Sequence, residues 1–153
     1  MRTRALFLAI VIGLLALSTS ACGMPTVRQL RHQPSIAAES AEKFARVAFV
    51  EGNVKAAYDL IWEEGKRRLS VDAAARAIAD INKAGRPSEV EATEYEPILG
   101  QPAMNIFLHG KGEAGDFYYR FVMMGTEDTG YRVADFFKGS GPYPPSNMRK
   151  PLH

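Results

Sequence analysis

Three titratable side chains lie in segments whose composition is typical of strands: His109, Tyr118 and Asp135. A carboxylate that accepts a proton, assisted by a tyrosine or a histidine, forms a general acid–base set. The catalytic hypothesis for this chain is therefore Asp135 as the base, with Tyr118 or His109 assisting. We expect no metal and no cofactor, because the sequence has a single cysteine, no cluster of His, Asp and Glu at ligand spacing, and no glycine-rich phosphate loop.

The elements that must position these residues begin with three helices. Apolar residues recur at three- and four-residue spacing over 35–51, over 53–65 and over 70–83, which predicts one amphipathic helix in each range. At the start of each range stands a residue whose short polar side chain can cap the first turn: Ser35, Asn53 and Ser70.

The pattern then changes from helical to strand-like. Four segments follow, three of them rich in aromatic or β-branched residues, and turns that contain glycine separate them: 88–97, 103–111, 116–125 and 130–138. Short turns between neighbouring strands imply antiparallel hairpins. Three helices followed by four antiparallel strands predict an α+β fold.

The turn positions decide which side chains share a face of this sheet. We expect turns centred on 113–114 and on 127–128, which sort the strand residues into two sets. The first set is almost wholly apolar and should pack on the helices: Met104, Ile106, Leu108, Phe117, Tyr119, Phe121, Met123, Ala134 and Phe136. Its one titratable member, Tyr119, has no acid or base beside it, so we expect a core aromatic. A small apolar ligand could still be enclosed there.

The second set also contains Asn105, Val122, Met124 and Val133. Its rings and charged groups form the candidate interaction face: Phe107, His109, Tyr118, Arg120, Tyr131, Asp135 and Phe137. On this register Arg120 lies opposite Asp135, which predicts a cross-strand ion pair. Several large rings are unusual on the wet surface of a monomer, and rings around an arginine are typical of interface cores. The expected partner of this face is a second copy of the chain or another protein.

The first residues have the composition of an export signal. Arg2 and Arg4 precede an apolar run over 5–17, which is shorter than the roughly 20 residues that cross a bilayer as a helix. Small residues then lead into Cys22. The stretch 18–22 resembles the lipobox of bacterial lipoproteins, with Thr19 where leucine is most frequent. The resemblance implies that Cys22 becomes the acylated first residue of the mature chain.

This resemblance also implies a location. It makes the protein an exported one, bound to the cell envelope through Cys22, and Gly23 stands where the family's inner-membrane retention signal has aspartate. The implied site is the outer membrane if the organism has two. Ordinary secretory cleavage after Ala21 and an uncleaved anchor are the alternatives. Removing 1–21 deletes two arginines and no acid, so 17 basic and 17 acidic side chains are left, without the basic footprint of a nucleic-acid binder.

Two stretches point to a fold family. The sequences EGNVKAAY at 51–58 and GYRVADFF at 130–137 are similar to those of small exported lipoproteins with a nuclear transport factor 2-like domain, and the similarity spans about 36–138. It implies a cone in which a curved four-stranded antiparallel sheet wraps over three helices, with a second sheet face that often mediates dimers. It implies no activity, since that superfamily includes enzymes and non-enzymes.

The chain is thus expected to comprise a signal peptide (1–21), a tether (22–34), an α+β domain (35–139) and a mobile C-terminal tail (140–153). The leading hypothesis is a cell-envelope lipoprotein with a non-catalytic ligand-binding or protein-binding domain. The alternative is a cone-fold enzyme that uses Asp135 with Tyr118 or His109 on a small substrate. That alternative requires the second sheet face to line the cavity.

Overall fold

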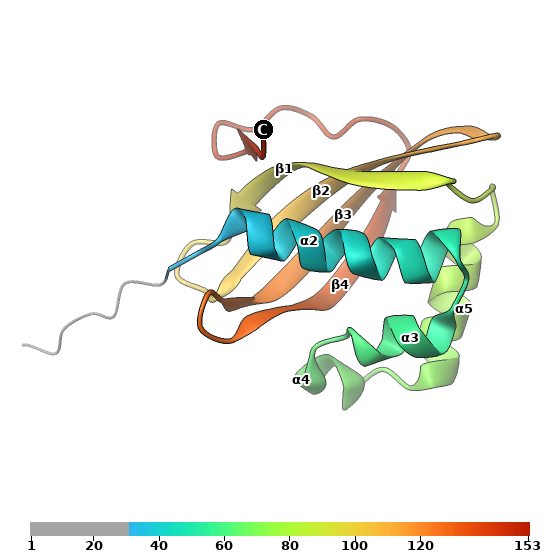
Figure 1. The fold of residues 1–153 in the computed structure, drawn as a ribbon, viewed down its shortest axis with the longest axis horizontal. Helices are drawn as coiled ribbons and strands as arrows, with labels where there is room; N and C mark the ends of the chain where they lie inside the picture. Colours follow the sequence, from blue (N-terminus) through green and yellow to red (C-terminus); the bar gives the residue numbers. More distant parts are fainter. Residues whose placement is uncertain (1–30) are drawn as a thin grey trace, which may run out of the picture.

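The computed structural model describes residues 31–153, which form an α+β domain (Figure 1). The expected signal peptide, Cys22 and most of the tether fall in 1–30 and lie outside the described residues. The elements follow in this order: α2 (Pro34–Ala45), η1 (Arg46–Val50), α3 (Val54–Asp59), α4 (Glu63–Lys66), α5 (Val71–Asn82), β1 (Glu89–Pro97), β2 (Ala103–Gly112), β3 (Gly115–Thr126), β4 (Gly130–Gly139) and β5 (Lys150–Pro151).

One antiparallel sheet contains all the strands, in the order β4-β3-β2-β1-β5. The predicted α+β fold with antiparallel hairpins is confirmed, and the four long strands lie within one residue of their predicted ranges. The predicted number of strands is wrong, because β5 pairs with Glu94 and Tyr95 of β1. The segment expected to be a mobile tail therefore contributes the fifth strand.

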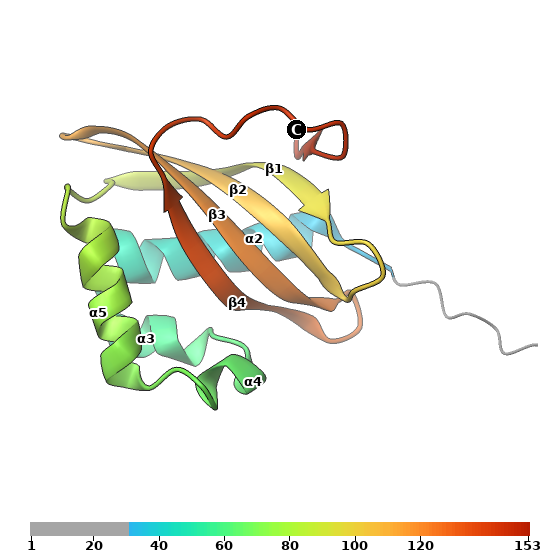
Figure 2. The ribbon, with the colours of Figure 1, turned by 180° about the vertical axis from the view of Figure 1, so that it is seen from behind.

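The α2–η1 segment covers one face of this sheet. α2 lies across it, and α3 and α5 pack against each other at one end (Figures 1 and 2). The expectation that Ser35 caps the first helix is wrong, because α2 already begins at Pro34 and its N-cap is Gln33. Proline suits the first turn, where its missing N–H has no intrahelical partner to lose. Within the described part of the chain, no helix has the length and apolar character needed to cross a membrane.

The first predicted helix changes its winding near its end. In η1, a π-helix, the N–H of Glu51 donates to the carbonyl of Arg46, five residues earlier. Gly52 follows with φ 70°, a left-handed conformation that favours glycine, and ends the helix as expected. Single π turns within helices are frequent at functional sites.

Both other predicted caps are confirmed. The side chain of Asn53 accepts a hydrogen bond from Ala56 N–H at 3.1 Å, and that of Ser70 accepts one from Ala73 N–H at 3.2 Å. These bonds satisfy backbone donors that the first turn of a helix leaves free. They place the starts of α3 and α5.

The second predicted helix is interrupted by contact with the sheet. Between α3 and α4, Val133 of β4 donates its N–H to the carbonyl of Leu60 at 3.2 Å and accepts the N–H of Trp62 at 2.9 Å. These bonds occupy backbone groups at 60–62 that a continuous helix would use. The link between the helices therefore covers the first half of the β4 edge.

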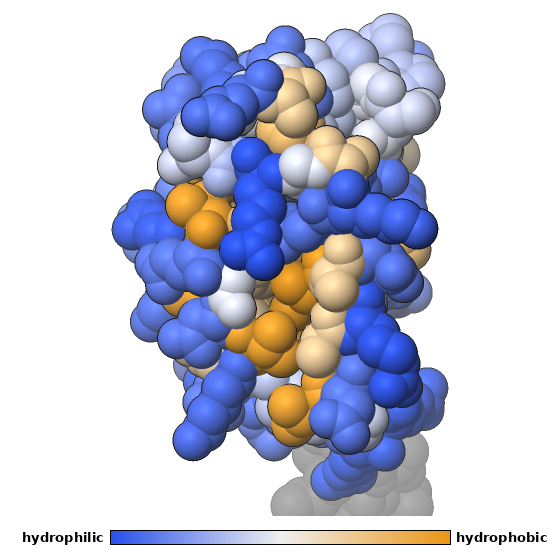
Figure 3. Space-filling view, turned by 90° about the vertical axis from the view of Figure 1, so that its right-hand side faces the viewer, coloured by the Kyte–Doolittle hydropathy of each residue, from blue (hydrophilic) through white to orange (hydrophobic). Residues whose placement is uncertain are grey.

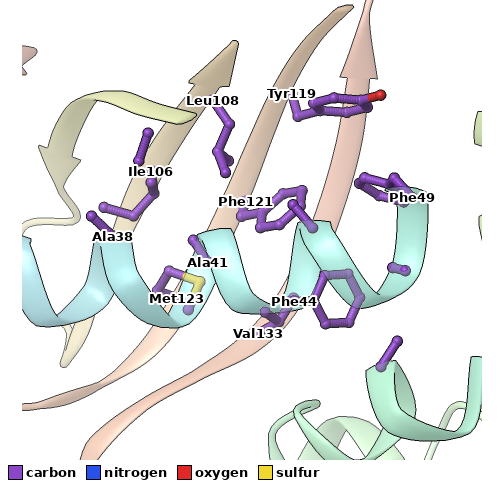
Figure 4. Close-up of a cluster of buried hydrophobic side chains, with 14 of the residues drawn as sticks. Ala38, Ala41, Phe44, Phe49, Ile106, Leu108, Tyr119, Phe121, Met123 and Val133 are labelled. Atoms are coloured by element: carbon purple, nitrogen blue, oxygen red, sulfur yellow. The ribbon is translucent and has the colours of Figure 1, made fainter. Parts of the chain in front are cut away.

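The apolar set of strand side chains forms the core. The predicted register of β2 and β3 is confirmed, with Met104 opposite Met123 and Leu108 opposite Tyr119. Figure 4 shows core side chains of these strands projecting toward the helical layer. Two rings from that layer meet the sheet: Phe44 lies 5.5 Å from Phe121, and Phe49 stacks on Tyr119 at 4.8 Å, centroid to centroid.

The predicted register of β3 and β4 is wrong. Thr126 pairs with Gly130, so three residues connect the strands rather than two. The hydroxyl of Thr129 accepts the N–H of Thr126 at 2.9 Å and stabilises this longer turn. Because side chains alternate between faces, the one-residue shift turns the first half of β4 over.

A bulge in β4 then adds a second shift. Val133 lies opposite Met123 and Asp135 opposite Val122, which leaves Ala134 without a partner. The expectation that Ala134 packs on the helices is therefore wrong, and so is the assignment of Val133 to the second face, since Val133 is buried in the core. Beyond the bulge, Phe136 regains its predicted face, although its partner residue has changed.

Candidate functional site

The second sheet face brings some of the predicted interaction residues together. His109 and Tyr118 are cross-strand partners, and their rings stack with centroids 5.2 Å apart. His109 Nε2 also lies 3.1 Å from a carboxylate oxygen of Asp116. The guanidinium of Arg120 lies over the ring of Phe137, 4.7 Å from its centroid, which is a cation–π arrangement.

The predicted ion pair between Arg120 and Asp135 is wrong. Arg120 lies opposite Phe137, because the longer turn and the bulge together displace β4 by two residues from the predicted register. Asp135 is exposed, and its carboxylate accepts a hydrogen bond from the N–H of the next residue, Phe136, at 2.8 Å.

The assignment of Tyr131 to this face is also wrong. Its side chain lies on the helix-facing side and is only 5 % exposed. Its hydroxyl accepts the N–H of Gln33 at 2.9 Å, just before α2 begins. Burial raises the pKa of Tyr131. It is a core residue that links the start of α2 to β4.

The proposed catalytic set does not assemble. Tyr118 pairs with Gly139, four positions further along β4 than Asp135. At about 3.3 Å per residue, this separates Asp135 from Tyr118 by roughly 13 Å along the sheet. A general base must lie within hydrogen-bond reach of the proton it removes, directly or through one water. Asp135 therefore shares no site with Tyr118 or His109.

The C-terminal segment covers another part of the second face. The guanidinium carbon of Arg149 lies 3.9 Å from the centroid of the Phe107 ring, and the Tyr143 ring lies 5.2 Å from it. Arg149 also donates to Glu94 at 3.3 Å and to the carbonyl of Pro144 at 2.7 Å. Phe107 is consequently 4 % exposed. The hollow left beside it has a volume of about 310 Å³.

A larger groove runs between α5 and the outer edge of β4, with a volume of about 820 Å³. Apolar side chains from the link before α5, from α5 and its end, and from β4 line it: Leu69, Ala77, Ile81, Ala84, Phe136 and Phe137. Four charged residues also line it: Asp80, Lys83, Asp135 and Lys138. Because β4 is the last strand of the sheet, its second half has no strand neighbour on this side among residues 31–153.

The end of the molecule that carries α5 presents apolar surface. Figure 3 shows hydrophobic side chains in a band on this end, bordered by hydrophilic ones. In the described residues, the exposed large hydrophobic side chains include Val71 at the start of α5 and Phe137 of β4. No group of three or more His, Cys, Asp or Glu residues in this part of the chain could hold a metal ion.

The sequence analysis missed the groove and its polar members. The helix α5 was predicted, but no sequence pattern indicates that it lies beside the edge of β4. Lys138 ends a predicted strand, where a charged residue normally faces solvent beside a turn. In the structure, its ammonium donates a hydrogen bond to the carbonyl of Ile81 in α5 at 3.0 Å. Asn82, next to the groove-lining Ile81 but not itself a lining residue, has the sequence position of a polar helix end, yet its amide atoms are buried. Its four-residue spacing from buried Ile78 is the signal that could have placed it inward.

Comparisons of the chain with protein families, with curated proteins and with solved structures found no match. The arguments about function therefore depend on the residues and the geometry of this molecule.

Proposed function

We propose that this protein is an exported lipoprotein, held on the cell envelope by acylated Cys22, whose domain binds a small apolar or amphiphilic ligand without catalysing a reaction. The groove between α5 and β4 carries this proposal. Its volume of about 820 Å³ falls within the roughly 300–1,000 Å³ typical of small-molecule sites, which are mostly apolar with a few polar groups. In a two-membrane bacterium we place it in the outer membrane.

We assign the domain to the nuclear transport factor 2-like cone fold as part of this proposal. Helices on one face of a single antiparallel sheet support the assignment, as does the order of helices first and strands second. The bulges at Thr93 in β1 and at Ala134 in β4 also support it, because bulges bend a sheet and increase its twist. The assignment carries no activity with it.

Binding is favoured over the catalytic alternative by the placement of the titratable groups. Asp135 is exposed at the rim of the groove, about 13 Å along the sheet from Tyr118. Binding of a small ligand is favoured over self-association through the second face, because Arg149 and Tyr143 of the same chain already pack against the ring of Phe107.

The groove is tested with N-phenyl-1-naphthylamine, a neutral fluorophore whose emission rises in apolar surroundings. The protein is the mature chain with Cys22→Ser, so that no acyl chain competes for the probe. We expect saturable binding, and Ala77→Trp should weaken it by about tenfold or more by filling the groove.

The matched control is Ala79→Trp, on the exposed side of α5 and outside the groove. It adds the same indole to the same helix and should leave binding unchanged. The proposal would be refuted if the chain without either tryptophan substitution bound no probe saturably. It would also be refuted if Ala77→Trp and Ala79→Trp weakened probe binding equally.

The anchor is tested separately by intact mass spectrometry after detergent extraction. We expect acyl mass on Cys22 and its loss in Cys22→Ser. An unmodified thiol at the mature terminus would show ordinary secretory cleavage instead, and a chain that keeps 1–21 would show an uncleaved anchor.

A further inference from the structure

The outer edge of β4 carries backbone groups that point into the groove rather than into the sheet. Their direction follows from β3, where the N–H of Gly125 donates to the carbonyl of Pro102 on the β2 side at 2.7 Å. Successive residues of a strand turn their N–H and carbonyl to alternate sides. Tyr119 lies an even number of residues before Gly125, so its backbone groups also face β2. Its partner on β4, Lys138, therefore turns both its N–H and its carbonyl away from β3.

Lys138 is the outer-edge residue of the groove with both backbone groups open. The same alternation turns Phe136 outward, and its N–H already donates to the carboxylate of Asp135 at 2.8 Å. No bond from another segment of 31–153 reaches the backbone N–H or carbonyl of Lys138. Because Lys138 lines the groove, a ligand there meets one free donor and one free acceptor on a single residue.

The first half of the same edge shows what such a pair of groups accepts. The N–H of Val133 donates to the carbonyl of Leu60 at 3.2 Å, and its carbonyl accepts the N–H of Trp62 at 2.9 Å. These two amide groups flank a single residue, Ile61, so one amino-acid unit of the chain fills this position. Lys138 offers the same pair of groups further along the edge. It is therefore suited to a second amino-acid unit with an amide on each side.

The charges of the groove favour a neutral ligand. Two acidic and two basic side chains line it, so their formal charges sum to zero: Asp80, Lys83, Asp135 and Lys138. The ammonium of Lys138 donates to the carbonyl of Ile81 at 3.0 Å, and the carboxylate of Asp135 is bonded to a backbone N–H. A charged group that leaves water needs a partner of opposite charge, whereas an amide needs only hydrogen bonds. An amide head group can obtain these bonds from Lys138.

We infer that the α5–β4 groove takes an acylated amino-acid amide, a neutral amphiphile whose acyl chain is joined through an amide to one amino-acid unit. The unit pairs with the backbone N–H and carbonyl of Lys138 as an added strand residue would, and the acyl chain lies along the apolar lining. The inference rests on the proposed function, because it places the ligand in the same groove. A single unit is favoured over a long peptide, since the N–H of Phe136 is already bonded and β4 ends at Gly139.

The test measures displacement of N-phenyl-1-naphthylamine from the mature Cys22→Ser chain by two neutral ligands of equal length. One is N-octanoylglycine N-methylamide, and the other is methyl octanoyloxyacetate, in which an ester oxygen replaces each N–H. The amide should displace the probe at a concentration about fivefold lower, as expected for one added hydrogen bond. Burial alone would favour the less polar diester, so a preference for the amide reports the bond itself.

A pair of variants locates this bond on Lys138. Lys138→Pro removes the backbone N–H, and proline is tolerated on an edge strand where that N–H faces outward. Lys138→Ala is the matched control, because it removes the same ammonium and keeps the N–H. Displacement by the amide should require about fivefold more ligand in Lys138→Pro than in Lys138→Ala. Similar probe affinity in both variants shows that both are folded.

Each contrary result has a distinct meaning. Equal displacement by the amide and the diester, with the probe bound, overturns this inference alone, and it decides the matter even if Lys138→Pro does not fold. Equal displacement by the amide in two folded variants overturns it as well. Equally strong displacement by N-acetylglycine N-methylamide would make an unacylated peptide the occupant and overturn the acylated class. Failure of the probe to bind the chain without these substitutions overturns the proposed function and the inference together.

Discussion

Tyr119 and Tyr131 lie on the same face of the sheet, and both are buried, yet their hydroxyls meet different surroundings. That of Tyr131 accepts the N–H of Gln33 at 2.9 Å, whereas that of Tyr119 has no hydrogen-bond partner in the described residues. A hydrogen bond of this kind contributes about 1 kcal/mol to stability, and a buried unsatisfied group costs about 1–3 kcal/mol. The two hydroxyls should therefore affect the free energy of unfolding with opposite signs.

Replacing each tyrosine with phenylalanine tests this difference. Without ligand, Tyr119→Phe should raise the free energy of unfolding by about 1 kcal/mol, because it removes an unsatisfied hydroxyl and keeps the ring stacked on Phe49. Tyr131→Phe should lower the free energy by about 1 kcal/mol and leave Gln33 N–H without its acceptor. Urea unfolding followed by circular dichroism measures both changes.

A loss of stability in Tyr119→Phe would contradict this interpretation, because it would show that the hydroxyl has a structural partner. A gain would confirm that the hydroxyl is an unsatisfied polar group within the core.

The limits of sequence-based prediction become clear in two elements, β3 and β4. The alternation of apolar residues in β2 and β3 was enough to predict the core side of Met104, Ile106, Tyr119 and Phe121, because the turn between these strands has the expected length. The same alternation failed for Tyr131, because the turn that precedes it is one residue longer and is stabilised by Thr129. Turn length depends on such local bonds rather than on hydrophobic periodicity.

The helices show the same division between local and tertiary signals. Asn53 and Ser70 could be predicted as caps, because a cap is a bond between residues three apart. The interruption between α3 and α4 could not, since it depends on backbone bonds from Leu60 and Trp62 to Val133 on a distant strand. The π turn of η1 likewise leaves no pattern in the apolar spacing over 35–51.

The candidate site was the least predictable part for the same reason. The rings and charges of the second face were recognised by composition, but β5 and Arg149, which cover Phe107, come from a segment without strand-like periodicity. The groove depends on the packing of α5 beside β4, and its polar members have ordinary types in the sequence. Only its bond to the carbonyl of Ile81, on a distant segment, makes Lys138 distinctive.

At the scale of the whole molecule, the groove lies far from the point where the described chain begins, just before α2. The chain enters the domain at the start of α2, and α5 lies near the other end of that helical segment (Figure 1). α2 and η1 together span about 25 Å at 1.5 Å per residue. In the proposed lipoprotein, the acyl anchor would therefore leave the groove free to meet a ligand, and the second face would be shielded by the chain's own C-terminal segment.

The most direct test of this account is to locate a bound amphiphile by intermolecular nuclear Overhauser effects. The experiment uses octanoate with the isotope-labelled mature chain carrying Cys22→Ser. We predict contacts from the octanoate chain to the methyl groups of Ala77 and Ile81, which line the groove from α5. Contacts confined to Val122 and Met124 on the second sheet face, or no intermolecular contacts at saturating octanoate, would contradict the claim that the α5–β4 groove is the binding site.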